Sequence, residues 1–200
     1  MSLREDNATE RQIQNALYYY LVNSFEIIFP NMDIVTSYEA DILGITRAGY
    51  AYEYEIKTSL SDFRADRKKR EKHATLAGTI RRIEYPPAPW VRGPDYYVMA
   101  DAPDDPREAL RYQCFPDRRP KQFWYVLCGF SVPNGELPEY AGLMTYDVDK
   151  NRFFVIKAAP NLPALKVSQE RMKRALRNML YRYWQLRLKD GPGRTDDCPE

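Results

Sequence analysis

The chain contains little cysteine and almost no histidine. Its three cysteines, Cys114, Cys128 and Cys198, are odd in number and widely spaced among 200 residues, which argues against a disulfide framework and against a zinc ribbon or finger. The single histidine, His73, excludes His-rich metal sites and any mechanism that needs two imidazoles. No G-x-S-x-G segment supports a serine triad through it, so we expect His73 to be a surface residue.

Long hydrophobic runs and phosphate-binding loops are also missing. No apolar run reaches the roughly 18 residues of a transmembrane helix, and the first eleven residues are polar. A G-x-x-x-x-G-K-[ST] loop is absent, which counts against a P-loop phosphoryl enzyme. With 44% hydrophobic and 29% charged residues, the composition is that of a globular domain. We therefore expect a soluble, cytoplasmic protein with no membrane partner.

The net charge of +2 hides an uneven distribution. Residues 64–73 hold six basic and two acidic side chains, a net +4, and residues 168–189 hold seven basic and one acidic, a net +6. The rest of the chain must then carry −8. Two cationic stretches on an acidic body favour a polyanion partner that binds one face, although solvated helix surfaces would explain them equally well.

Periodicity and turn signals predict an α/β fold with a mixed central β-sheet flanked by helices. Expected helices span 9–25, 59–77 and 168–189, and expected strands span 33–45, 50–58, 123–130, 143–146 and 152–157, with a short strand at 96–99 inside the proline-rich, loop-like stretch 84–122. A turn at 47–49 makes the first two strands a hairpin, and Ser61 is the candidate cap of the second helix. We expect one domain over 1–165, an amphipathic basic helix over 166–190 that packs on it, and a flexible tail over 191–200.

The second strand of this hairpin carries the residues with the most chemistry. Side chains alternate along a strand, so Glu53, Glu55 and Lys57 share one face. On the preceding strand Glu39 and Asp41 share a face, and pairing across the turn brings Asp41 beside Glu55. Two carboxylates and an amine are thus predicted to meet at one point.

Such a pair suits Mg²⁺, or Mn²⁺ in its place. Hard divalent cations take one or two carboxylates together with waters and substrate phosphate oxygens, and Asp41 and Glu55 are the candidate ligands, with the Ile56 carbonyl as a further one. A bound cation lowers the pKa of water and offsets charge on a phosphodiester, while Lys57 orients that water. The competing interpretation is a surface salt-bridge cluster on an exposed sheet face.

Asp41, followed fourteen positions later by Glu55-Ile56-Lys57, resembles the motif of the PD-(D/E)XK, or restriction-endonuclease-like, nuclease superfamily. The order helix, strand, strand and helix around it is similar to the core of that family, and Ala40 stands where the family has proline. The segments 58–68, 138–143 and 157–160 are similar to bacterial and phage branches with DNA-repair associations.

The resemblance implies a restriction-endonuclease-like core and a Mg²⁺-dependent deoxyribonuclease in bacterial or phage DNA processing, with a homodimer as one possible assembly. It makes Glu10, from the first helix, a possible additional ligand and Ser59 a further site candidate. Glu39 and Glu53 are candidates because they share strand faces with Asp41 and Glu55, and pairing with nearby Lys or Arg is the alternative. Basic residues after the site are expected to contact DNA phosphates; these are Arg64, Arg67, Lys68, Lys69, Arg70 and Lys72. Asp62 and Asp66 are expected to cap or pair with these cations. The alternative is a nucleic-acid-binding or assembly protein that keeps the fold without cleaving.

Overall fold

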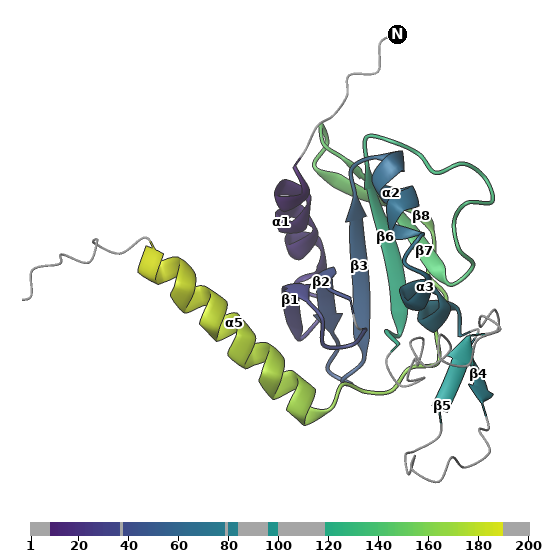
Figure 1. The fold of residues 1–200 in the computed structure, drawn as a ribbon. Coiled ribbons are helices and arrows are strands. Elements are labelled where there is room, and N and C mark those ends of the chain that lie inside the picture. Colours follow the sequence, from purple (N-terminus) through teal and green to yellow (C-terminus); the bar gives the residue numbers. More distant parts are fainter. Residues whose placement is uncertain (1–8, 37, 79, 84–95, 100–118, 190–200) are drawn as a thin grey trace, which may run out of the picture. The chain divides into compact units, whose positions relative to one another are not determined.

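A six-stranded mixed sheet is the centre of the fold (Figure 1). The computed structural model describes residues 9–36, 38–78, 80–83, 96–99 and 119–189. Its elements are α1 (Glu10–Leu21), β1 (Ile27–Met32), β2 (Ala40–Ile45), β3 (Ala51–Lys57), α2 (Leu60–Asp66), α3 (Arg70–Ala77), β4 (Ile80–Ile83), β5 (Tyr96–Met99), β6 (Gln122–Cys128), β7 (Ala141–Asp147), β8 (Arg152–Lys157) and α5 (Gln169–Lys189). The strand order is β1-β2-β3-β6-β7-β8, parallel for β3-β6-β7 and antiparallel elsewhere, and β4 and β5 form a separate pair. The expected mixed α/β architecture is confirmed.

Helix α1 begins at the cap that its sequence predicts. The Thr9 hydroxyl accepts a hydrogen bond from the Gln12 backbone, and the Gln12 side chain accepts one from the Thr9 backbone, which makes a capping box. Ile13, Leu17 and Leu21 recur at helical spacing and are buried against the sheet. The helix ends at Leu21, four residues before the expected Phe25.

Helices α2 and α3 contribute apolar side chains to a second core. Phe63 and Leu76 are fully buried and pack with Phe123, Tyr125 and Leu127 of β6. Tyr54, Ile56 and Val126 belong instead to the core under α1. Both faces of the β3-β6 region are therefore covered, as expected for central parallel strands.

The first strand of the sheet was not predicted, and the second is shorter than predicted. Strand β1 carries Pro30, which sequence reasoning treats as a strand breaker, but β1 lies at the sheet edge, where a missing N–H is tolerated. The expected strand over 33–45 begins only at Ala40. The expected turn is confirmed, with Gly49 at a φ of 84° that favours glycine.

The predicted single helix over 59–77 is wrong, because the chain breaks at residues 67–69 between α2 and α3. In an unbroken helix Lys72, nine residues after Phe63, would lie roughly 180° from it. Leu76 would also point away from Phe63. The break instead lets α2 and α3 bury apolar residues in one core. The cap is Ser59 and not Ser61, since the Ser59 hydroxyl accepts from the Asp62 N–H at 3.2 Å.

The chain divides into two units, residues 1–166 and residues 167–200. The second contains α5, which confirms the helix expected over 168–189 to within one residue. Basic residues occur along the length of this helix, and large apolar side chains on it, such as Leu180 and Trp184, are exposed. None of the described helices is long and apolar enough to cross a membrane. The expected tail over 191–200 lies outside the described residues.

The cysteine prediction is tested at one position. Cys128, at the end of β6, is buried and reduced. Cys114 and Cys198 lie outside the described residues, as does most of the proline-rich stretch 84–122. Its expected short strand is confirmed as β5, which pairs with β4.

Candidate active site

The β2-β3 hairpin brings Asp41 to Glu55. Ile42 pairs with Tyr54 in the antiparallel register, and continuing by one residue places Asp41 opposite Glu55. The Asp41 Oδ2 atom accepts a hydrogen bond of 2.6 Å from the Ile56 N–H. The Asp41 carboxylate therefore lies at the end of β3, near enough to Glu55 for the charge of Glu55 to raise its pKa.

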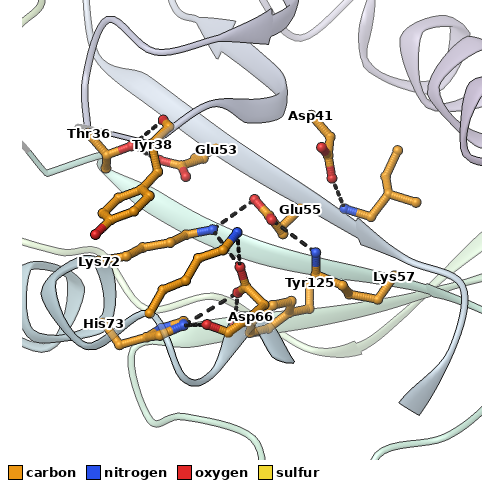
Figure 2. Close-up of polar contacts among 12 residues, drawn as sticks. Thr36, Tyr38, Asp41, Glu53, Glu55, Lys57, Asp66, Lys72, His73 and Tyr125 are labelled. Carbon is orange, nitrogen blue, oxygen red and sulfur yellow. Dashed lines mark hydrogen bonds and ion pairs between the residues drawn. The ribbon is translucent and has the colours of Figure 1, made fainter. Parts of the chain in front are cut away.

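Glu55 lies between two lysine ammonium groups (Figure 2). Lys57 Nζ donates to Glu55 Oε1 at 3.0 Å, and Lys72 Nζ of α3 lies 2.9 Å from Oε2. All three side chains are at most 7% exposed, so the charged face of β3 is buried and the predicted alternative, an exposed sheet-face salt bridge, is wrong.

Asp66, the last residue of α2, holds the other end of this network. Its carboxylate accepts hydrogen bonds from the Tyr125 hydroxyl at 2.8 Å and from Lys72 Nζ at 3.3 Å, and it pairs with Lys69 at 2.9 Å. Burial opposes its ionisation, but the bond with His73 and the Lys72 charge hold the pKa of Asp66 far below its usual range. Asp66 pairs with cations, as predicted.

Two other carboxyl groups are shifted in the opposite direction. Burial raises the pKa of Asp41 to about 7, and the charge of Glu55 adds to the effect, while the Ile56 N–H and Lys57 oppose it. Burial raises the pKa of Glu53 to about 8 against the opposing charge of Lys72. Glu53 is fully buried, and its Oε1 has no hydrogen-bond partner. It is therefore mostly protonated at neutral pH.

The donor set fits a single Mg²⁺ of the two-carboxylate kind. Asp41 and Glu55 supply oxygens from adjacent strands, and the Ile56 carbonyl points to the same side as its N–H, toward Asp41. Waters and phosphate oxygens would complete the shell. Among the described residues no group of three or more His, Cys, Asp or Glu side chains is arranged around a metal position, so a more heavily coordinated ion is not indicated there.

Of the three possible additional carboxylates, Glu53 is buried as described above, and Glu10 and Glu39 differ in their relation to Asp41. Glu10, at the start of α1, is exposed. Its charge still raises the pKa of Asp41, though less than burial and the charge of Glu55 do. Glu39 is exposed and precedes β2 instead of sharing a strand face with Asp41. Ser59, the remaining candidate, caps α2.

Five of the six expected phosphate-binding residues are exposed, and the sixth, Lys72, is buried. The prediction that Lys72 contacts DNA is wrong, because its ammonium is completely buried between Glu55 and Asp66 and cannot reach a DNA backbone in this structure. Arg64 makes a two-point ion pair with Glu136, and Arg67 donates to the Glu136 carbonyl at 2.6 Å. The remaining three, Lys68, Lys69 and Arg70, are exposed like Arg64 and Arg67, and of these three Lys69 also pairs with Asp66.

His73 was predicted at the surface and is instead part of the network. Its Nδ1 is hydrogen bonded to the Tyr140 hydroxyl and its Nε2 lies 2.8 Å from the Asp66 carbonyl. Only 12% of its side chain is exposed. Sequence reasoning assigned Lys72 to DNA contact instead of to this network, and the available signal was that Phe63 and Leu76 cannot share one face of an unbroken helix. It did not include Tyr125 or Tyr140 in the site.

Comparisons with known proteins add information about the fold alone. No protein-family model matches the chain, and no curated protein matches it. A solved structure of a protein of unknown function from Silicibacter pomeroyi is similar, with a TM-score of 0.52 and 15% sequence identity over 96% of this chain and 99% of that one. At this identity the likeness concerns the α/β fold.

Proposed function

We propose that the chain is a metal-dependent nuclease that hydrolyses DNA phosphodiester bonds and has a restriction-endonuclease-like core. The observation that supports this most is the position of Asp41 and Glu55 on adjacent antiparallel strands, with the Asp41 carboxylate hydrogen bonded to the Ile56 N–H and Lys57 Nζ 3.0 Å from the Glu55 carboxylate. The motif resemblance and the element order α1-β1-β2-β3-α2 around it agree with this assignment.

Asp41 and Glu55 would hold Mg²⁺ or Mn²⁺ with the Ile56 carbonyl. The cation supplies electrophilic polarisation of the phosphate and a water of lowered pKa. Lys57 keeps its ammonium charged, because Glu55 and Asp66 raise its pKa despite the opposing effect of burial. It therefore donates hydrogen bonds, orienting the attacking water and stabilising negative charge on the phosphate. The hydrogen bond from Ile56 N–H fixes the Asp41 carboxylate during this step.

The exposed cations Lys68 and Arg70 lie between α2 and the first turn of α3. In this proposal they contact the DNA backbone near the cleaved bond, where each neutralised phosphate adds salt-dependent affinity. Arg64 is less available, since Glu136 neutralises its guanidinium.

A second candidate is a nucleic-acid-binding or assembly protein that does not cleave. It is favoured by the charge balance of the buried network, where Glu55 and Asp66 are matched by Lys57 and Lys72 without any added cation. A protein of this kind would bind DNA through the same exposed cations and leave the carboxylates as structural ion pairs.

The decisive experiment incubates labelled single-stranded, duplex and forked DNA with the purified protein in Mg²⁺, Mn²⁺ or EDTA. Cleavage by the wild type should require metal and should fall by about 10²-fold or more in Lys57→Met, as expected for loss of a charged transition-state donor. Lys150→Met is the matched control, because it removes an exposed lysine that pairs with Asp147 at the end of β7.

The same experiment separates the two candidates. Circular dichroism should show that Lys57→Met and Lys150→Met keep the wild-type fold. Tight DNA binding without cleavage under any metal would favour the non-catalytic protein. Cleavage that persists in Lys57→Met would remove this site from the mechanism.

A further inference from the structure

The buried ammonium of Lys72 bridges the candidate metal ligand Glu55 and the anchor Asp66. We propose that Lys72 is an internal counter-ion: it neutralises Glu55 in the metal-free protein and shifts fully to Asp66 when a divalent cation binds. This inference rests on the metal-binding part of the proposed function, but it does not require cleavage.

Lys72 has two carboxylate partners within reach of one ammonium group. Its Nζ lies 2.9 Å from Glu55 Oε2 and donates to Asp66 Oδ1 at 3.3 Å. The ammonium can therefore leave Glu55 and keep its bond to Asp66. Only the contact that competes with a metal has to break.

The surroundings keep Lys72 charged and confined in either position. Its side chain is 0% exposed, and its Nζ lies 5.2 Å from the centre of the Phe123 ring, within the range of a cation-π contact. Asp66 is fixed by the Tyr125 hydroxyl at 2.8 Å, so it is a rigid acceptor. An unpaired buried ammonium would be costly, and Asp66 avoids that cost after Glu55 is taken.

Competition for Glu55 predicts that Lys72 weakens metal binding. Mn²⁺ affinity, measured by electron paramagnetic resonance of the free ion, should increase by about tenfold or more in Lys72→Met, because a positive charge next to the ion is removed. Lys69→Met is the matched control. Lys69 also pairs with Asp66, at 2.9 Å, but it is 45% exposed and has no recorded contact with Glu55, so its loss should leave Mn²⁺ affinity within about twofold.

A second readout uses the wild-type protein and therefore does not depend on a variant that folds. With ¹⁵N-labelled lysine, the Lys72 ammonium should give a slowly exchanging signal, because that group is buried, and Lys72→Met assigns it if the variant folds. Otherwise through-space contacts of the ammonium with the Phe123 ring assign it. The signal should move as Mg²⁺ is added, at concentrations at which Mg²⁺ displaces Mn²⁺.

Three outcomes would overturn the proposal: equal Mn²⁺ affinity in wild type and Lys72→Met, a Lys72 signal that does not move while Mg²⁺ binds, or no metal binding in either protein. A wild type that cleaves DNA, with unchanged affinity in Lys72→Met, would refute the counter-ion and leave the nuclease intact. Tightened Mn²⁺ binding without any cleavage would support the counter-ion and refute the nuclease.

Discussion

Glu53 is the most deeply buried carboxyl group of the site, and its replacement gives a direct test of the electrostatic account. Its side chain is fully buried, its Oε1 lacks a partner, and its Oε2 lies 3.5 Å from the Thr36 hydroxyl. Burial raises the pKa of Glu53 to about 8 from the ordinary 4.5, against the opposing charge of Lys72. Glu53→Gln keeps the shape of the protonated acid and cannot ionise.

The pKa difference sets the size and the sign of the effect. Between pH 4.5 and about pH 8 the folded protein holds a proton on Glu53 that the unfolded chain has lost. Its free energy of unfolding therefore falls as pH rises through this window. One pKa unit corresponds to about 1.4 kcal/mol, so ionised Glu53 costs the folded state at most roughly 5 kcal/mol. We expect a decline of a few kcal/mol that Glu53→Gln lacks.

Urea denaturation of both proteins between pH 4 and pH 9 measures this. The difference in unfolding free energy, variant minus wild type, should grow with pH and level off above about pH 8. Asp41 also has a raised pKa, about 7, but it is present in both proteins and largely cancels in the difference. Glu53→Met, an apolar side chain of similar size, should remove the same pH slope. Parallel curves for wild type and both variants would refute a protonated, buried Glu53.

Three further predictions address packing, capping and DNA binding. Phe63→Ala should lower the free energy of unfolding by about 3–5 kcal/mol in urea denaturation, because the fully buried ring packs 4.8 Å from the Tyr125 ring; a loss below 1 kcal/mol would contradict this packing. Ser59→Ala should cost about 1 kcal/mol in the same assay, whereas Ser61→Ala should cost little if Ser59 is the cap. Lys68→Glu combined with Arg70→Glu should weaken DNA binding and flatten its salt dependence in fluorescence anisotropy, and an unchanged slope would exclude this surface.

Local patterns were sufficient to predict most elements of the fold. The periodicity of Ile13 and Leu17 predicted α1, and the apolar run from Phe123 predicted the central strand β6. They failed at β1, because Pro30 is compatible with a strand only at a sheet edge. Edge position is a property of the sheet order, which the local sequence does not contain.

The part of the candidate site that depends on strand geometry was predicted from the sequence. Alternation and the hairpin turn were enough to bring Asp41, Glu55 and Lys57 together. They could not place Lys72, because a contact between α3 and β3 depends on the break at residues 67–69. Counting charges therefore placed Lys72 at the surface with its basic neighbours. In the structure Lys72 is buried and those neighbours are exposed.

Four buried charged side chains surround the end of β3. Glu55 and Asp66, with Lys57 and Lys72, form a balanced set of charges at most 7% exposed. Buried ion pairs rarely stabilise a fold better than apolar side chains of similar volume, since desolvation offsets their attraction. The opposite face of β3, with Tyr54 and Ile56, packs in an ordinary apolar core. Stability alone therefore does not account for four buried charges beside a protonated Glu53, and the proposed metal-binding function would account for them.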